Sequence, residues 1–398
     1  MSNWEKTTIG NLCDSISDTY KRNDENVVLI NTSDVLEGEV LNHKPVLNQK
    51  LKGQFKKTFR ISDILYSEIR PANKRFAFID FEDTSNYIAS TKLMVLRPRT
   101  SIVLPEFLFA ILKSKNVVDE LQHLAETRSG TFPQITFSSE LAPMEVFIPD
   151  ISTQEQIVSI LKAIEDKIKN NTAINENLEQ QAQAIFKSWF VDFEPFGGVM
   201  PEDWNVCTLD SICNLIIKGI TPKYTEDSEQ LVINQKCVRN HQIDLSLARP
   251  HIPKKTNEKW LKYGDILVNS TGTGTLGRAA QVLFVPNNLT VDSHVTIIRA
   301  SKAEYIHFLG LWATSHEHDF VMLQTGSTGQ TDLPRERLKK MQILLPSIDI
   351  LKKFSSIIKP ISDTQINNHQ ENQRLSALRD TLLPKLMNGE IDVSQVRI

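Results

Sequence analysis

One long helical stretch, repeated later in the chain, constrains the fold more than any other feature. From about residue 152 to residue 193, apolar side chains recur at alternating steps of four and three, which is typical of a coiled-coil face. The same frame, moved from Ile157 to Phe354, meets a second such face that continues to Leu386. The segment Ser152–Glu155 fits a capping box, which predicts that the first helix begins at Ser152. Two matching faces predict two helices that pack against each other.

Asparagines interrupt each apolar seam near its midpoint. Asn171 and Asn175 lie in the first seam, and Asn368 and Asn372 lie at the matching places in the second. Polar residues in such a seam cost stability and are used to fix register. In an antiparallel pair of symmetric register, Asn171 faces Asn372 and Asn175 faces Asn368. The alternative is two independent surface helices whose asparagines are exposed to solvent.

The regions that precede the two helices also correspond. The segment Trp4–Gly10 resembles Trp204–Asp210, and Phe59–Leu65 resembles Leu261–Leu267. Strand and helix signals mix in both regions without a strict alternation, which predicts an α+β class. The expected strands are Ile64–Tyr66, Phe76–Ile79, Ile266–Val268 and Ala279–Val285, and the expected helices are Leu104–Leu112 and Ile306–Thr314.

The chain is therefore expected to be a pseudo-two-fold internal repeat: globular unit, long helix, globular unit, long helix. The predicted limits are 1–150 and 194–347 for the globular units, 151–193 for the first spacer helix, and 348–398 for the second with its C-terminal tail. Helices of this length span about 60 Å. If they pair antiparallel, the two units lie at opposite ends of a rigid spacer, an arrangement that suits the reading of split DNA sites.

Basic residues gather at equivalent places in both globular units. The run from Lys44 to Arg60 contains no acidic residue, and the run from Arg249 to Lys262 is interrupted only by Glu258. Such runs suit phosphate contacts, and the alternative is a solvated, lysine-rich face. Because the net charge is −3, DNA binding has to depend on local patches. The expected DNA-contacting residues are Lys52, Lys56, Lys57, Arg60, Arg70, Lys74, Arg75, Arg249, Lys254, Lys255, Lys259, Lys262, Ser270, Thr271, Thr273 and Arg278.

Two segments resemble nucleotide-binding or catalytic motifs, but the residues around them do not support either function. The segment Gly272–Gly277 matches a dinucleotide-binding fingerprint, but a strand-like segment follows it, so we interpret it as a hairpin loop. Asp150, Glu165 and Lys167 imitate a nuclease motif, yet the last two fall on the predicted helix. We therefore predict no catalytic site.

The composition predicts a cytoplasmic protein without a bound metal. The cysteines are not spaced as metal ligands, and His316 and His318 are expected to be exposed on a helix. No apolar signal region or membrane-spanning run is present, which favours a cytoplasmic protein with reduced thiols.

In this order, and twice, these motifs resemble the specificity subunits of type I restriction–modification systems. The resemblance covers essentially the whole chain. It is carried by Gly264–Val268 with Ser270–Gly274, by Ile148–Gln156 and by Leu378–Glu390. The first repeat departs from the pattern, because Ser62 replaces the glycine and no Ser-Thr-Gly loop follows. Its base-contacting loop is therefore not assigned from the sequence.

The resemblance implies a non-catalytic subunit whose globular units are target recognition domains, each reading one half of a bipartite site in double-stranded DNA. The helices would set the gap between the halves and dock two methyltransferase (modification) subunits, and restriction/translocase subunits would join the full complex. S-adenosylmethionine, ATP and Mg would belong to those partners, with no cofactor in this chain. Alternatives are a stand-alone DNA-modifying enzyme with unrecognised catalytic residues, or a structural coiled-coil protein.

Overall fold

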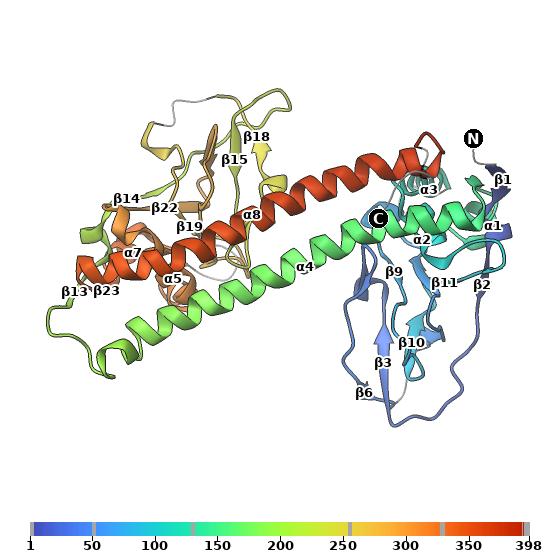
Figure 1. Ribbon diagram of the computed structural model, residues 1–398, viewed down its shortest axis with the longest axis horizontal. Coiled ribbons are helices and arrows are strands. Elements are labelled where there is room, and N and C mark those ends of the chain that lie inside the picture. The colour runs from blue at the N-terminus through green and yellow to red at the C-terminus, as the bar shows by residue number, and fades with distance from the viewer. Residues whose placement is uncertain are drawn as a thin grey trace. The chain divides into compact units, whose positions relative to one another are not determined.

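The computed structural model describes residues 4–49, 53–128, 132–253, 257–326, 331–391 and 393. It divides into two compact units (Figure 1). The first unit comprises residues 1–168 and 373–398, and the second comprises residues 169–372. Their boundaries fall inside the two long helices, α4 (Ile151–Phe190) and α8 (Ile348–Met387), so each helix contributes to both units. The domain limits expected from the sequence were set at the ends of the predicted helices. The two units are instead defined by which residues pack together, so their boundaries fall within the helices.

The first unit places sheets beside helices. Its strand orders are β1-β12, β6-β3-β10-β7, β2-β11-β8-β9 and β4-β5. The strands are β1 (Glu5–Thr8), β2 (Cys13–Ile16), β3 (Asn26–Ile30), β4 (Val35–Leu36), β5 (Glu39–Val40), β6 (Val46–Leu47), β7 (Phe55–Lys57), β8 (Ile64–Ser67), β9 (Phe76–Phe78), β10 (Tyr87–Ser90), β11 (Leu93–Pro98) and β12 (Glu145–Ile148). The helices before α4 are α1 (Ile9–Leu12), α2 (Pro105–Lys113) and α3 (Lys115–Arg128).

The second unit follows the same plan. Its strand orders are β13-β23, β18-β15-β21, β14-β22-β19-β20 and β16-β17. The strands are β13 (Asn205–Thr208), β14 (Cys213–Lys218), β15 (Leu231–Ile233), β16 (Val238–Arg239), β17 (Gln242–Ile243), β18 (Arg249–Pro250), β19 (Ile266–Asn269), β20 (Ala279–Gln281), β21 (Leu289–Val291), β22 (Val295–Ala300) and β23 (Gln342–Leu345). The helices before α8 are α5 (Ile306–Ser315), α6 (Glu317–Met322) and α7 (Arg335–Lys339).

Alternation along the central strands explains the layers. In β8, Ile64 and Tyr66 enter a core shared with helices α2 and α3, while Leu65 enters a second core on the other face. In β19, Ile266 and Leu267 divide in the same way between two cores. Because successive side chains point to opposite faces, a strand buried on both faces is apolar throughout. The predicted α+β class is confirmed.

The long helices complete the core of each unit. In the first unit, Ile157 and Leu161 of α4 and Leu383 and Leu386 of α8 belong to one buried cluster. In the second unit, the cluster includes Ala182, Phe186 and Phe190 of α4 and Leu351, Phe354 and Ile358 of α8. Here Phe186 and Phe190 are buried, while Ile185 and Trp189, which continue the heptad seam, are half-buried against the same cluster. Steps of four keep this end of α4 on the globular core, because an α-helix has 3.6 residues per turn.

Within the second unit, α4 and α8 pair through the asparagines. Asn171 Nδ2 donates to Asn372 Oδ1 at 3.0 Å, and Asn368 Nδ2 donates to Asn175 Oδ1 at 2.9 Å. Rising numbers in one helix meet falling numbers in the other, so the pair is antiparallel. This is the pairing expected from a symmetric register, and it excludes two independent helices with exposed asparagines.

Several local expectations can be compared with the structure. The helix expected at Leu104–Leu112 is α2, which begins at Pro105, and β20 ends at Gln281, well before Val285. The capping box at Ser152 is wrong. The helix begins at Ile151, and Asp150 Oδ1 accepts the Thr153 amide at 2.9 Å, so Asp150 is the cap.

Candidate nucleic-acid interface

The structure divides the cations expected to contact DNA into two groups. Lys56, Arg60, Arg70 and Lys262 are exposed, and the described part of the chain offers them no ion pair. The second group contacts protein atoms instead: Lys57, Lys74, Arg75, Arg249, Lys259 and Arg278. Lys52, Lys254 and Lys255 lie outside the described residues.

Contacts with the protein limit what the second group can do. Lys57 Nζ donates to Leu93 O at 2.8 Å, and burial lowers the pKa of this ammonium group. Lys259 Nζ donates to Gly219 O at 2.9 Å. The structure thus commits several of the expected DNA ligands to holding loops in place, which the charge pattern alone did not reveal.

The loop after β19 is the hairpin expected from the sequence, and it corrects one residue. β19 and β20 pair antiparallel on either side of Gly272–Gly277, and no helix begins there. Ser270 is fully buried, and its hydroxyl bonds with the Thr296 hydroxyl. The expectation that Ser270 contacts DNA is therefore wrong, since this side chain supports the loop from inside. Thr273 is exposed at the tip.

In the second domain, which is the globular part of the second unit, polar side chains from separate loops converge beside this hairpin. Thr271 Oγ1 lies 3.3 Å from Gln235 Oε1, to which it donates, and 2.8 Å from His294 Nδ1. His294 is exposed, and its backbone amide is held by Asp292 Oδ1 at 2.9 Å. On the other side of Thr271, a bridge joins it to Asp332, whose carboxylate contacts Lys218. We call Gln235, Thr271 and His294 the second loop cluster.

A glycine makes this cluster possible. Gly272 has a φ of +103°, and a Cβ at this position would lie 2.6 Å from Gln235 Oε1. Any larger residue would push the Gln235 side chain away and strain the backbone. Gly272 therefore leaves room for the Gln235 side chain to pack against this loop.

The same place in the first domain carries different chemistry. Glu68 Oε2 accepts from Gln134 Nε2 at 3.0 Å and lies 3.5 Å from Lys92 Nζ. Lys92 is exposed, and its backbone amide donates to Ser90 Oγ at 3.3 Å, as the His294 amide donates to Asp292. We call Glu68, Lys92 and Gln134 the first loop cluster.

Strand register shows that the two clusters share one equivalent position and otherwise use neighbouring positions of the same strands and bridges. Leu93 pairs with Ser67 in the first domain, and Val295 pairs with Asn269 in the second. Lys92 therefore corresponds to His294, because each precedes the paired residue of its strand. By the same rule Glu68 corresponds to Ser270, and the bridges Ile69–Gln134 and Thr271–Asp332 make Gln134 the counterpart of Asp332.

The sequence alone did not assign the base-contacting loop of the first domain. Gln235, His294, Glu68, Lys92 and Gln134 are not among the DNA-contacting residues expected from the sequence. Strand pairing identifies these positions, because the residues come from segments far apart in the chain.

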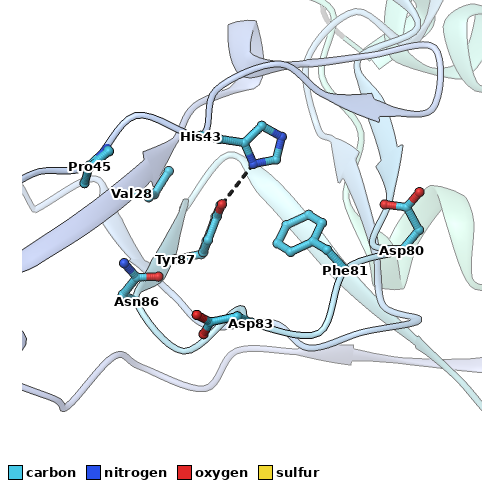
Figure 2. A pocket seen from close by; sticks show the side chains of 8 residues that line it. All are labelled: Val28, His43, Pro45, Asp80, Phe81, Asp83, Asn86 and Tyr87. Carbon is cyan, nitrogen blue, oxygen red and sulfur yellow. Dashed lines mark hydrogen bonds between the residues drawn. The ribbon is translucent and has the colours of Figure 1, made fainter.

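A separate cavity lies in the first domain at the other end of β10. It has a volume of about 520 Å³. Figure 2 shows Phe81 and the hydrogen-bonded pair His43 and Tyr87 in its wall, with Asp80 and Asp83 beside them. The bond joins His43 Nδ1 and Tyr87 Oη at 2.9 Å. Carboxylates in the wall disfavour phosphate binding. Tyr87 is the first residue of β10, whereas Lys92 follows the other end of this strand, so the cavity is not part of the first loop cluster.

The remaining motifs do not gather into a reaction centre. Glu165, part of the nuclease-like pattern, bonds with Lys113 instead. His318 is exposed as expected, but His316 is half-buried and stacks on Trp312 with ring centroids 4.6 Å apart, so that expectation is wrong. Among the described residues, no group of three or more His, Cys, Asp or Glu side chains could hold a metal ion, and no helix is long and apolar enough to span a membrane.

Comparison with known proteins identifies the repeat. Residues 1–180 and 201–377 each match the family model described as the type I restriction modification DNA specificity domain. The chain is 33% identical over 469 aligned residues to the type I restriction enzyme HindI specificity subunit of Haemophilus influenzae, covering 98% of this chain and 100% of the relative. It is 27% identical over 315 residues to the MjaIX specificity subunit of Methanocaldococcus jannaschii, covering 74% of this chain and 71% of that one.

A solved structure shares the fold. The S subunit of a type I restriction–modification system from M. genitalium aligns over 97% of this chain and 96% of that chain, with a TM-score of 0.58 and 16% identity. Two matches to one domain family, a full-length relative and this shared fold lead to one conclusion. The chain belongs to the family of type I restriction–modification specificity subunits.

Proposed function

We propose that this specificity subunit is a non-catalytic DNA reader whose two domains each recognise one half of a bipartite site. The observation that carries the proposal is the pair of loop clusters. Equivalent strand pairs, β8 with β11 and β19 with β22, place Lys92 beside Glu68 in one domain and its counterpart His294 beside Thr271 in the other. A common scaffold with different polar side chains is what two readers of different sequences require.

The remaining exposed cations fit a supporting role. Lys56, Arg60, Arg70 and Lys262 are free to contact phosphates, which position a protein on DNA without reading sequence. We propose that α4 and α8 set the gap between the half-sites and dock two modification subunits, with restriction subunits completing the complex. S-adenosylmethionine, ATP and Mg would then be held by those partners.

Mapping methylated bases tests this function. The genome of the host is compared with that of a strain lacking this gene. We expect one bipartite motif, methylated in both halves, that loses its methylation in the deletion strain. An unchanged methylation pattern would contradict the proposal.

A second measurement separates the alternatives. The purified chain is incubated with S-adenosylmethionine and DNA, with and without its modification subunits. Methyl transfer by the chain alone would favour a stand-alone enzyme, and DNA binding without sequence preference in the full complex would favour a structural protein. We expect sequence-specific transfer only with the partner subunits.

A further inference from the structure

The two loop clusters differ in the hydrogen-bonding groups that they leave available. In the second cluster, Thr271 uses its proton on Gln235 Oε1, so His294 Nδ1 is the donor to the Thr271 hydroxyl. This arrangement fixes the tautomer of His294 and leaves its Nε2 as an acceptor. Within the described residues, neither Gln235 Nε2 nor His294 Nε2 has a hydrogen-bond partner. The cluster is thus held together from one side while its outer groups stay free.

The first cluster presents a carboxylate between two cations. Glu68 Oε2 is engaged by Gln134 and approached by Lys92, and the charges of Lys57 and Glu68 act on each other. Glu68 Oε1 has no partner within the described part of the domain. A carboxylate repels phosphate, so Glu68 itself is not suited to contact the DNA backbone. It is suited to accept a hydrogen bond from an amino group on a base edge.

From these arrangements we propose that Glu68, Lys92 and Gln134 read base edges in one half-site, and that Gln235, Thr271 and His294 read them in the other. This inference rests on the proposed function and names the residues that carry it. The chemistry assigns a preference to each domain. Glu68 accepts from an exocyclic amino group, as on cytosine, and the Gln235 amide suits the adjacent donor and acceptor of adenine.

Neighbouring residues hold the backbone of the proposed reading residues in place. Asp292 and Ser90 fix the backbone amides of His294 and Lys92, and Gly272 leaves room for the Gln235 side chain. Reading residues whose backbones are fixed by neighbouring side chains lose little freedom on binding DNA. Charged residues that only contact phosphate do not need such support.

Substitutions in the complete complex test the inference. The chain and its modification subunits methylate a DNA library in which both half-sites are randomised, and the methylated fraction is sequenced. For Glu68→Gln we expect the preference at one or two adjacent positions of one half-site to fall about tenfold or more, with the other half-site unchanged. Gln235→Ala should give the same result in the opposite half-site.

Matched controls use the same side-chain types elsewhere in each domain. Glu39 in β5 and Gln342 in β23 are exposed. Glu39→Gln and Gln342→Ala should leave the preferred bases of both half-sites unchanged. His294→Ala provides a second variant in the second cluster, since this exposed side chain is not needed for packing. It should relax the same half-site as Gln235→Ala.

The outcomes separate this inference from the function beneath it. If the wild-type complex shows no preferred bipartite sequence, the proposed function fails. If the wild type is specific while the cluster variants keep its preferences, only the assignment of these residues fails. A uniform loss of methylation at all sequences, equal in both half-sites, would assign the clusters to backbone contacts and overturn the inference.

Discussion

Asp63 and Asp265 are buried carboxylates that each hold one arginine in the same geometry. Asp63 is 1% exposed and accepts two hydrogen bonds of 2.8 Å from Arg97, and Asp265 accepts two of 2.7 Å from Arg299. Each aspartate also accepts a backbone amide from three residues earlier. This explains the repeated Asp-Ile-Leu signal: the aspartate fixes the turn that starts a central strand.

Removing one arginine should destabilise its domain strongly. In Arg97→Met the carboxylate of Asp63 remains buried without a counter-ion, and breaking such a pair costs about 3 to 5 kcal/mol. We expect urea unfolding of the purified chain to show an early transition that the wild type lacks. Arg299→Met should do the same for the second domain.

A neighbouring ion pair supplies the control. Arg99 and Asp14 form the same kind of contact, at 2.6 Å, but both side chains are well exposed. Water screens such a pair, so Arg99→Met should leave the unfolding midpoint nearly unchanged. Equal effects of the Arg97 and Arg99 substitutions would show that burial of Asp63 is not the source of the stability.

At the scale of elements, a tight hairpin ties the second domain to α4. Asn240 and His241 join β16 to β17 with φ values of 50° and 58°, which fit the two-residue turn favoured in hairpins. His241 Nδ1 lies 3.2 Å from Glu179 of α4, and its Nε2 lies 3.7 Å from Glu317 of α6. The hydrogen bond with Glu179, aided by the charge of Glu317, raises the pKa of His241 despite its burial.

This contact should make the stability of the second unit depend on pH. Because the folded state raises the pKa of His241, its contribution is complete below the ordinary histidine value of about 6.5 and is lost as the pH rises through the raised value. Burial pushes the pKa of Glu179 up, but its hydrogen bonds outweigh this and lower it, so Glu179 stays charged in that window. The difference in unfolding midpoint between the wild type and His241→Gln should therefore shrink from about pH 6 to about pH 8.

The exposed His318 is the comparison for this experiment. It lies on α6 without an ion pair among the described residues. His318→Gln should shift the midpoint little, and equally at each pH. A pH-independent difference for His241→Gln would contradict the assigned role of the contact with Glu179.

What the sequence could predict at this scale depends on the range of the interaction. The seams of α4 and α8 and the apolar strands follow from residue spacing within each helix or strand. Matching the two seams predicts the asparagine pairing, and the structure agrees at Asn171 and Asn175. The loop clusters do not follow from spacing. Gln235, Thr271 and His294 come from three segments, and only the pairing of strands brings them together.

Departures from the expected sites have the same cause. Ser270 was expected at the DNA surface because it stands in a polar loop, but a hydroxyl directly after a buried strand can turn inward to Thr296. Lys57 was counted as a free cation, yet a backbone carbonyl is within its reach. Charge in a sequence shows which residues could meet phosphate, and the fold decides which of them are already engaged.

At the scale of the whole molecule, the proposed function assigns α4 and α8 the role of setting the unread gap in the DNA site. The antiparallel register is fixed in the second unit by Asn175 with Asn368, and Gln365 Nε2 donates to Asn175 O at 3.2 Å nearby. A change of length that keeps this register must therefore be made in both helices. One heptad lengthens a helix by about 10 Å, the rise of about three base pairs of DNA.

Adding a heptad to both helices should lengthen the gap and leave the half-sites unchanged. The insertions are placed in α4 between Asn175 and Ala182 and in α8 between Ile358 and Gln365, between the asparagine layer and the buried cluster of the second unit. We expect methylation mapping to show the same two half-sites separated by at least one and at most about three more base pairs. An insertion in α4 alone mismatches the seam and should abolish methylation. A matched insertion that methylates the original spacing would show that the helices do not set the gap.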